Sequence, residues 1–278
     1  MIVNYGSLAH IISVLLALAI CAAFFLFLRG KSRKIQISVI YSIMALNIFQ
    51  HLFKSYIYPQ YAGLGFTSLN TAYNMCATLI LISPLAMLIN RRPIKNFVFY
   101  IGSVAGMIAI VIPYWSIGKP ASDPDFIRSF ICHAMLFLSS MLPLLLGIHK
   151  PKYKCAFELG VGFLAVIGII IFNDVLCLIA GIYPGVEGMT VLDALYRISP
   201  VWSFGPPEEF SWVLTLADAV LPSAWTGHGG ISRPIPVLWY AIPLYIGITL
   251  IALPITIAAD YKSFKQDMER IFRKKSKK

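Results

Sequence analysis

Seven apolar stretches, most of them near 20 residues long, limit what this chain can fold into more than any other feature. An α-helix rises 1.5 Å per residue, so about 20 residues cross the roughly 30 Å hydrocarbon core of a bilayer. Because the bilayer core offers backbone groups no hydrogen-bond partners, such stretches cross it as helices. The predicted spans are residues 8–28, 36–57, 69–89, 96–113, 126–147, 155–182 and 236–258.

The composition excludes the other common classes of protein. Of the 278 residues, 58% are hydrophobic and 13% charged, whereas soluble domains have roughly 45–50% and about 25%. A transmembrane barrel is disfavoured because its strands alternate in hydrophobicity over roughly 10 residues, and these stretches are continuous. The five cysteines are odd in number and lie within or beside apolar stretches, so they predict no disulfide framework. We therefore expect an all-α membrane protein, a bundle of about seven transmembrane helices forming a single domain over residues 1–278.

The net charge of +11 is distributed unevenly along the chain. Connections on one side of the predicted membrane hold 18 Lys and Arg residues and those on the other side hold 3. This asymmetry follows the positive-inside rule, which predicts the N-terminus outside and the C-terminus in the cytoplasm. The basic charge thus has an orienting role, and no nucleic-acid partner is expected.

Two segments outside the spans have recognisable patterns. The predicted extracytoplasmic loop, residues 183–235, contains short amphipathic pieces at 190–198 and 206–221, and it could act as a lid or as a packing cap. The cytoplasmic tail, residues 260–278, combines apolar residues at helical spacing with many lysines and arginines. That pattern predicts a basic amphipathic helix on an anionic inner leaflet, or else a solvated tail.

Polar residues of four spans fall at one predicted depth, about 5–15 Å below the outer surface. Two interpretations remain open: a pocket that faces the extracytoplasmic side, or helices joined by hydrogen bonds, with Lys54 and Arg128 extending to the interface. The polar residues are Asn47, Gln50, His51, Lys54, Asn70, Thr71, Asn74, Cys76, Arg128, Ser129, His133, Asn173 and Asp174.

Known cofactor motifs do not account for these residues. Gly160, Gly162 and Ala165 match a dinucleotide fingerprint formally, but they lie in an apolar span and are better interpreted as small residues for close helix packing. His228, Gly229 and Gly230 are typical of an oxyanion-hole turn, yet no serine elbow accompanies them. The sequence has no P-loop and no zinc spacing, so no cofactor or metal is expected.

Three short motifs resemble those of a known family. Asn74-Met75-Cys76, Phe130-Ile131-Cys132-His133 and Asn173 resemble the YwaF family of bacterial integral membrane proteins, over about residues 36–182. The chain is more distantly similar to a eukaryotic transmembrane family that acylates ether phospholipids through a Cys/His pair, and to intramembrane threonine/histidine lipid hydrolases. Thr71 to Cys76 replaces the usual Leu-Pro-Leu-His-x-Cys run, without its proline and histidine. The resemblance implies a multi-pass protein of the bacterial cytoplasmic membrane.

Two functions follow from these residues. The first is acyl transfer or hydrolysis on a membrane lipid, with His133 as general base, Cys76 as nucleophile, Asn74 as oxyanion donor and Asp174 or Asn173 orienting the base. The second is a binding or transport protein in which Lys54 and Arg128 receive an anionic solute or lipid headgroup. His51 and Asn173 are expected beside the ligand in either case.

Overall fold

We describe the protein from a computed structural model, in which most of the chain is helical. The structure describes residues 1–58, 65–89, 91–113, 116–150, 152–183, 185–198, 204, 212–219, 221–227 and 234–275. Within these ranges the only β-type pairing is an isolated bridge between Ile2 and Pro120. The predicted all-α class is confirmed.

A helix lies at each of the seven predicted spans, although they differ in length. Six helices are long and apolar enough to cross a membrane: α1 (Leu8–Leu28), α2 (Arg33–Leu52), α5 (Arg92–Val111), α6 (Pro124–Leu145), α7 (Phe157–Ile179) and α11 (Leu238–Ala259). The helix at the third predicted span, α4 (Met75–Leu88), has 14 residues, about 21 Å at the usual rise. Its span was predicted to start at residue 69, but the short helix η2 (Ser68–Asn70) and extended backbone occupy the first residues.

The remaining helices are short or lie outside the bundle. They are α3 (Lys54–Ile57), η4 (Tyr153–Cys155), α8 (Val191–Ile198), α9 (Trp212–Asp218), α10 (Ser223–Thr226) and α12 (Tyr261–Lys275). The predicted piece 190–198 is confirmed as α8, and Thr190 Oγ1 accepts the Asp193 amide at 3.2 Å. Of the predicted piece 206–221, helix α9 covers the middle. Residues 206–211 and the His228–Gly230 turn lie outside the described residues.

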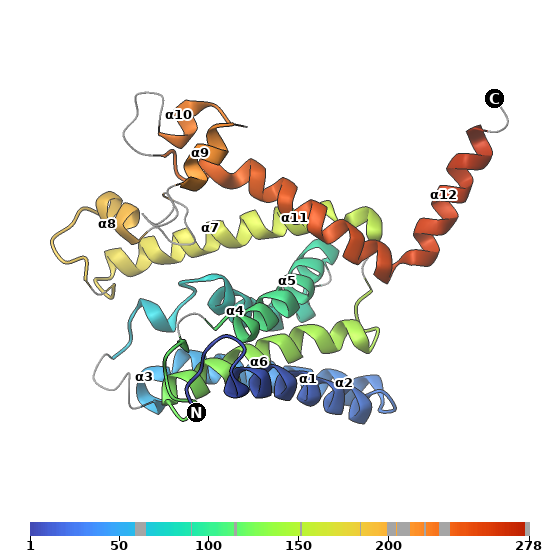
Figure 1. The fold of residues 1–278 in the computed structure, drawn as a ribbon, viewed down its shortest axis with the longest axis horizontal. Helices are drawn as coiled ribbons and strands as arrows, with labels where there is room; N and C mark the ends of the chain where they lie inside the picture. The colour runs from blue at the N-terminus through green and yellow to red at the C-terminus, as the bar shows by residue number, and fades with distance from the viewer. Residues whose placement is uncertain are drawn as a thin grey trace.

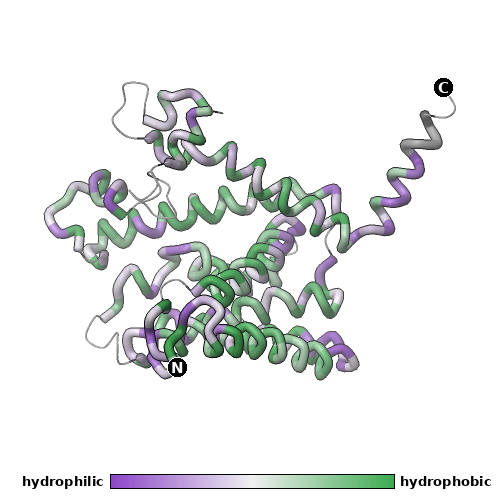
Figure 2. The backbone as a smooth tube through the Cα atoms, viewed as in Figure 1, coloured by the Kyte–Doolittle hydropathy of each residue, from purple (hydrophilic) through white to green (hydrophobic). Residues whose placement is uncertain are grey.

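The long helices form three layers (Figure 1). Helices α1, α2 and α6 make one layer, α4 and α5 lie in the middle, and α7 and α11 make the third. The N-terminus, α3 and α8 lie at one end of the bundle, which we call the α3 end, and α12 extends away from the other, which we call the α12 end. Hydrophobic residues dominate the bundle and hydrophilic residues dominate α12 (Figure 2).

Small residues set the spacing between these layers. A Cβ atom on Gly106 of α5 would lie 2.6 Å from the backbone nitrogen of Phe137 and 2.9 Å from the carbonyl oxygen of His133, both in α6. A Cβ on Gly160 of α7 would lie 2.5 Å from the ring of Tyr245 in α11. The interpretation of Gly160 as a packing residue is confirmed, and Gly106 brings α5 against the turn of α6 that carries His133.

Candidate functional site

A polar cavity of about 350 Å³ is lined by the end of α2, the start of α4 and the first turns of α6. Five of the eight predicted site residues line it, namely His51, Asn74, Cys76, Arg128 and His133. The other three, Lys54, Asn173 and Asp174, are not among its lining residues. The structure therefore brings together the proposed base, nucleophile and oxyanion donor. The other lining residues are Tyr73, Ala77, Ile80, Asp125, Ser129 and Cys132.

Helix α4 begins at this cavity because of Asn74. The Asn74 side chain caps the helix, with Oδ1 accepting the Ala77 amide at 2.8 Å. Cys76 is therefore the second residue of α4, where unpaired backbone amides and the helix dipole favour a negative charge. Unpaired amides at such a helix start can donate to an oxyanion that forms beside Cys76. Asn74 Nδ2 carries two further donor hydrogens at the same place.

Helix α6 positions His133 and determines which ring nitrogen carries the proton. His133 Nδ1 lies 2.8 Å from the carbonyl oxygen of Ser129, one turn earlier. A carbonyl oxygen only accepts, so this geometry assigns the proton to Nδ1 and the basic lone pair to Nε2. The sequence predicts that Asp174 or Asn173 orients the base. In the structure the Ser129 backbone holds Nδ1.

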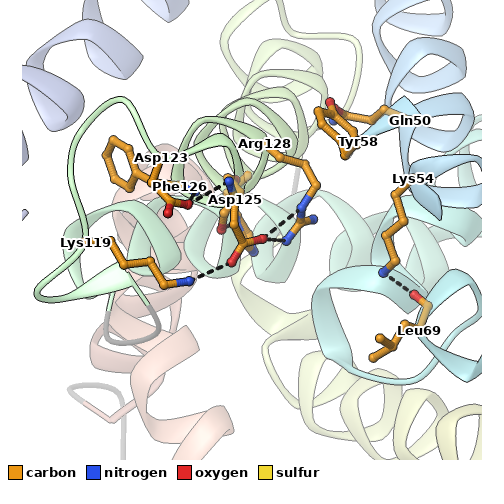
Figure 3. A network of polar contacts seen from close by, with 11 residues as sticks. Gln50, Lys54, Tyr58, Leu69, Lys119, Asp123, Asp125, Phe126 and Arg128 are labelled. Atoms are coloured by element: carbon orange, nitrogen blue, oxygen red, sulfur yellow. Dashed lines mark hydrogen bonds and ion pairs between the residues drawn. The ribbon is translucent and has the colours of Figure 1, made fainter. Parts of the chain in front are cut away.

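The start of α6 also brings charged groups to the cavity (Figure 3). Asp123 caps the helix by accepting the Asp125 and Phe126 amides, and Pro124 occupies the first turn, as is typical of helix starts. Arg128 donates to Asp125 Oδ1 through Nε at 3.2 Å and Nη2 at 2.9 Å. Lys119 pairs with the other oxygen of Asp125 at 3.0 Å. The carboxylate thus fixes the Arg128 guanidinium at the rim of the cavity.

His51 and Lys54 come from the α2–α3 segment and contact the chain just before α4. His51 Nε2 donates to the Thr71 carbonyl at 2.9 Å, and its ring lies nearly parallel to that of Tyr73, with centroids 6.3 Å apart. The Lys54 ammonium donates to the Leu69 carbonyl and lies 4.9 Å from the centre of the Tyr73 ring. Lys54 is buried rather than extended to the interface, and these contacts position the residues that lead into α4.

Asn173 and Asp174 form a separate cluster on α7. Asn173 donates from Nδ2 to Thr71 Oγ1 at 2.9 Å, and Thr71 Oγ1 lies 3.6 Å from the Cys177 sulfur. Asp174 is fully buried; its Oδ1 lies 3.4 Å from Asn173 Nδ2, and within the described residues its Oδ2 makes no hydrogen bond. His51 and Asn173 both donate to Thr71, so this cluster adjoins the polar cavity through Thr71.

Asp125 and Cys132 also line the cavity, although neither is among the site residues predicted from the sequence. Asp125 lies three residues before Arg128, in the first turn after a capping Asp-Pro pair. The sequence spacing therefore could have predicted an i, i+3 ion pair between them. Cys132 lines the cavity beside His133, and no spacing rule marks it. Among the described residues, no group of three or more His, Cys, Asp or Glu is arranged to hold a metal ion.

A second cavity, of about 480 Å³, is apolar and adjoins the first. Helices α4, α5, α7 and α11 line it, and most of its residues are isoleucine, alanine, valine, leucine, methionine or phenylalanine. Cys76 lines both cavities. The thiol therefore lies where a polar space meets an apolar one.

Comparison with known proteins identifies the family. The sequence model of the TMEM164 family matches residues 5–182, which is well over half of the chain and runs from before α1 to just after α7. No curated protein and no solved structure gives a significant match. The chain therefore belongs to the TMEM164 family, and it is a multi-pass helical membrane protein.

Proposed function

We propose that this member of the TMEM164 family transfers or hydrolyses an acyl group of a membrane lipid, using Cys76 as the nucleophile. The observation that carries the proposal is the position of Cys76, which lines both the polar cavity with His133 and the apolar cavity. A lipid ester has the same two-part character, with a polar group next to its carbonyl on one side and an apolar chain on the other.

The chemistry runs through a thioester. His133 Nε2 takes the thiol proton, and Cys76 Sγ attacks the ester carbonyl carbon. The resulting oxyanion is bonded by Asn74 Nδ2 and by backbone amides in the first turn of α4. When the intermediate collapses, the C–O bond breaks and the released alcohol takes the proton from His133. A second lipid hydroxyl or a water molecule then attacks the thioester, giving transfer or hydrolysis and restoring the thiol.

The sequence resemblance supports the same assignment. The segments that contain Asn74 to Cys76 and Phe130 to His133 resemble the YwaF family, and more distantly a eukaryotic family that acylates ether phospholipids. Both segments lie within residues 5–182, the range matched by the TMEM164 family. By this resemblance the protein works in a bacterial cytoplasmic membrane.

An anion-binding protein is the alternative, and one observation favours it. Arg128 lines the polar cavity, and its side chain is 17% exposed. In this alternative Arg128 receives a phosphate or carboxylate, and Cys76 is dispensable. Lys54 does not line the polar cavity, and its ammonium donates to the Leu69 carbonyl.

Capture of the acyl-enzyme tests the proposal. The purified protein is incubated in vesicles with a phospholipid that carries an alkyne-tagged acyl chain, and the protein-bound tag is measured before and after neutral hydroxylamine, which cleaves thioesters. Cys132→Ala is the matched control, because Cys132 lines the same cavity. We expect a hydroxylamine-sensitive tag that Cys76→Ala abolishes and Cys132→Ala retains. A tag that survives in Cys76→Ala contradicts the proposal, as does its absence from the unmodified protein.

A further inference from the structure

Helix α11 forms one wall of the apolar cavity, although it lies beyond the residues that the family model matches. Four of its residues line the cavity: Ile248, Ile251, Ala252 and Ile255. Their spacing of i, i+3, i+4 and i+7 places them on one face of the helix. Helix α11 is held at this distance by α7, where Tyr245 packs directly on Gly160. The wall is therefore built into the bundle.

The opposite wall is helix α5 with its C-cap residue Ile112, and its lining residues run from Tyr100 to Ile112. The twelve residue steps from Tyr100 to Ile112 correspond to about 18 Å at the helical rise, so the cavity is an elongated groove rather than a compact chamber. Its rim is exposed: Ile108 of α5 is 51% exposed and Ile251 of α11 is 67% exposed. Both residues lie in membrane-spanning helices, where the exposed surface faces lipid chains. The groove therefore opens sideways to the bilayer core.

The neighbouring polar cavity identifies the occupant of this groove. The two cavities share Cys76, so one molecule that fills both has a polar end beside Arg128 and an apolar body between α5 and α11. A hydrocarbon chain that moves from the bilayer core into this groove stays in an apolar environment. The acyl chain of a lipid fits the groove because it is apolar and elongated, is attached to a polar group, and reaches the groove from the bilayer core.

We propose that α11 is the wall that selects the length of the acyl chain, with Ala252 as the residue that makes room for it. Ala252 is 5% exposed, and its side chain is the smallest of the four on the lining face. A larger side chain at this position fills the groove. The identity of the reacting group rests on the proposed function, but binding of the chain does not require the reaction.

Photolabelling in a chemically inactive background tests the inference. The full-length Cys76→Ala protein in phosphatidylcholine vesicles is labelled with single-chain phosphatidylcholines that carry a diazirine on acyl chains of stepwise increasing length. The labelled peptides are then identified by mass spectrometry. Ala252→Phe is compared with Ala258→Phe, because Ala258 lies on the same helix, is exposed and does not line the groove. Ile255→Ala enlarges the groove at its rim, where folding is less at risk.

The inference predicts labelling on the lining segments of α5 and α11. Ala252→Phe reduces labelling by the longer chains by about tenfold, as expected for overpacking a filled space, whereas Ala258→Phe leaves it unchanged. Ile255→Ala shifts the preferred chain length upward. Equal labelling of the two phenylalanine variants overturns the inference, as does an unshifted length preference in Ile255→Ala. Because Cys76 is absent throughout, these results are independent of whether the thioester forms.

Discussion

The Nδ1 atom of His133 lies 2.8 Å from the carbonyl oxygen of Ser129, one turn earlier in the same helix. This contact joins a side chain to the backbone of its own helix, so it depends on α6 and not on a neighbouring element. It directs the basic Nε2 lone pair away from the Ser129 carbonyl. The proposed catalytic use of His133 rests on that tautomer.

We expect His133→Ala to slow the alkylation of Cys76 near neutral pH, because the variant lacks the base that takes the thiol proton. The rate is measured with a small membrane-permeant electrophile, in a protein whose other cysteines, Cys21, Cys132, Cys155 and Cys177, are replaced. The expected slowing is about tenfold or more, within the usual range for a general base.

Ser129→Ala is the matched control for that measurement. It removes the Ser129 hydroxyl, which lies 3.3 Å from His133 Nδ1, but it keeps the backbone carbonyl that sets the tautomer. Its alkylation rate is expected to stay near that of the parent. If the His133→Ala and parent rates match, His133 does not activate Cys76, and the anion-binding alternative is favoured.

The topology prediction concerns the two ends of the bundle. The charge asymmetry predicts that the α3 end, with α8, lies outside and that α12 lies in the cytoplasm. In a protein without native cysteines, single cysteines replacing Glu187 and Ser263 are labelled with a membrane-impermeant maleimide in intact cells and in inverted vesicles. We expect the first to react from outside and the second only in inverted vesicles. The reverse pattern contradicts the orientation.

Gly106 is expected to tolerate no larger residue, because its Cβ would lie within 3 Å of backbone atoms of Phe137 and His133. Backbone cannot move aside as a flexible side chain can, so Gly106→Ala forces α5 and α6 apart. The expected loss of stability is about 1–3 kcal/mol, read as a lower thermal unfolding temperature in detergent. Gly168→Ala in α7 is the control, since a Cβ there meets nothing within 4 Å. Equal behaviour of the two variants would contradict this packing.

His149 lies in the connection after α6, at the α12 end, and predicts a pH dependence of stability. Its Nε2 donates to Asn96 Oδ1 at 2.7 Å, and Asn96 donates from Nδ2 to Glu158 at 2.6 Å. Burial, and next the positive charges of Lys95 and Arg92, lower the pKa of His149 from 6.5 to about 4. The folded protein therefore keeps His149 neutral at a pH where the unfolded chain protonates it.

The sign follows from proton binding. Between pH 6.5 and about 4, the unfolded chain binds more protons at this site, so stability is full above that window and falls as the pH decreases through it. The contribution is on the order of 2 kcal/mol. The variant His149→Gln keeps a donor for Asn96 but does not titrate. Thermal unfolding in detergent from pH 7 to 5 should show a smaller loss for the variant; equal losses would exclude His149 as the source.

The long spans and the start of α6 could be predicted from the sequence because each depends on local properties. Residues 8–28 match α1 because burial in lipid requires a continuous apolar run of that length. The Asp123-Pro124 pair marks the start of α6 because a cap is a contact between near neighbours in the chain. The depth pattern likewise brought His51, Cys76 and His133 to one level, and all three line one cavity.

The direction in which each side chain faces was decided only by the tertiary structure. Equal depth placed Asp174 with His133, but Asp174 contacts Asn173 on α7, and the Ser129 backbone holds the His133 ring. Helix α4 begins later in the chain than the predicted start of the third span, because η2 and extended backbone precede Asn74. The groove between α5 and α11 has no motif, since it arises from the distance at which α7 holds α11. Helical periodicity reports depth and face for one helix at a time, whereas a cavity depends on how several helices are rotated against one another.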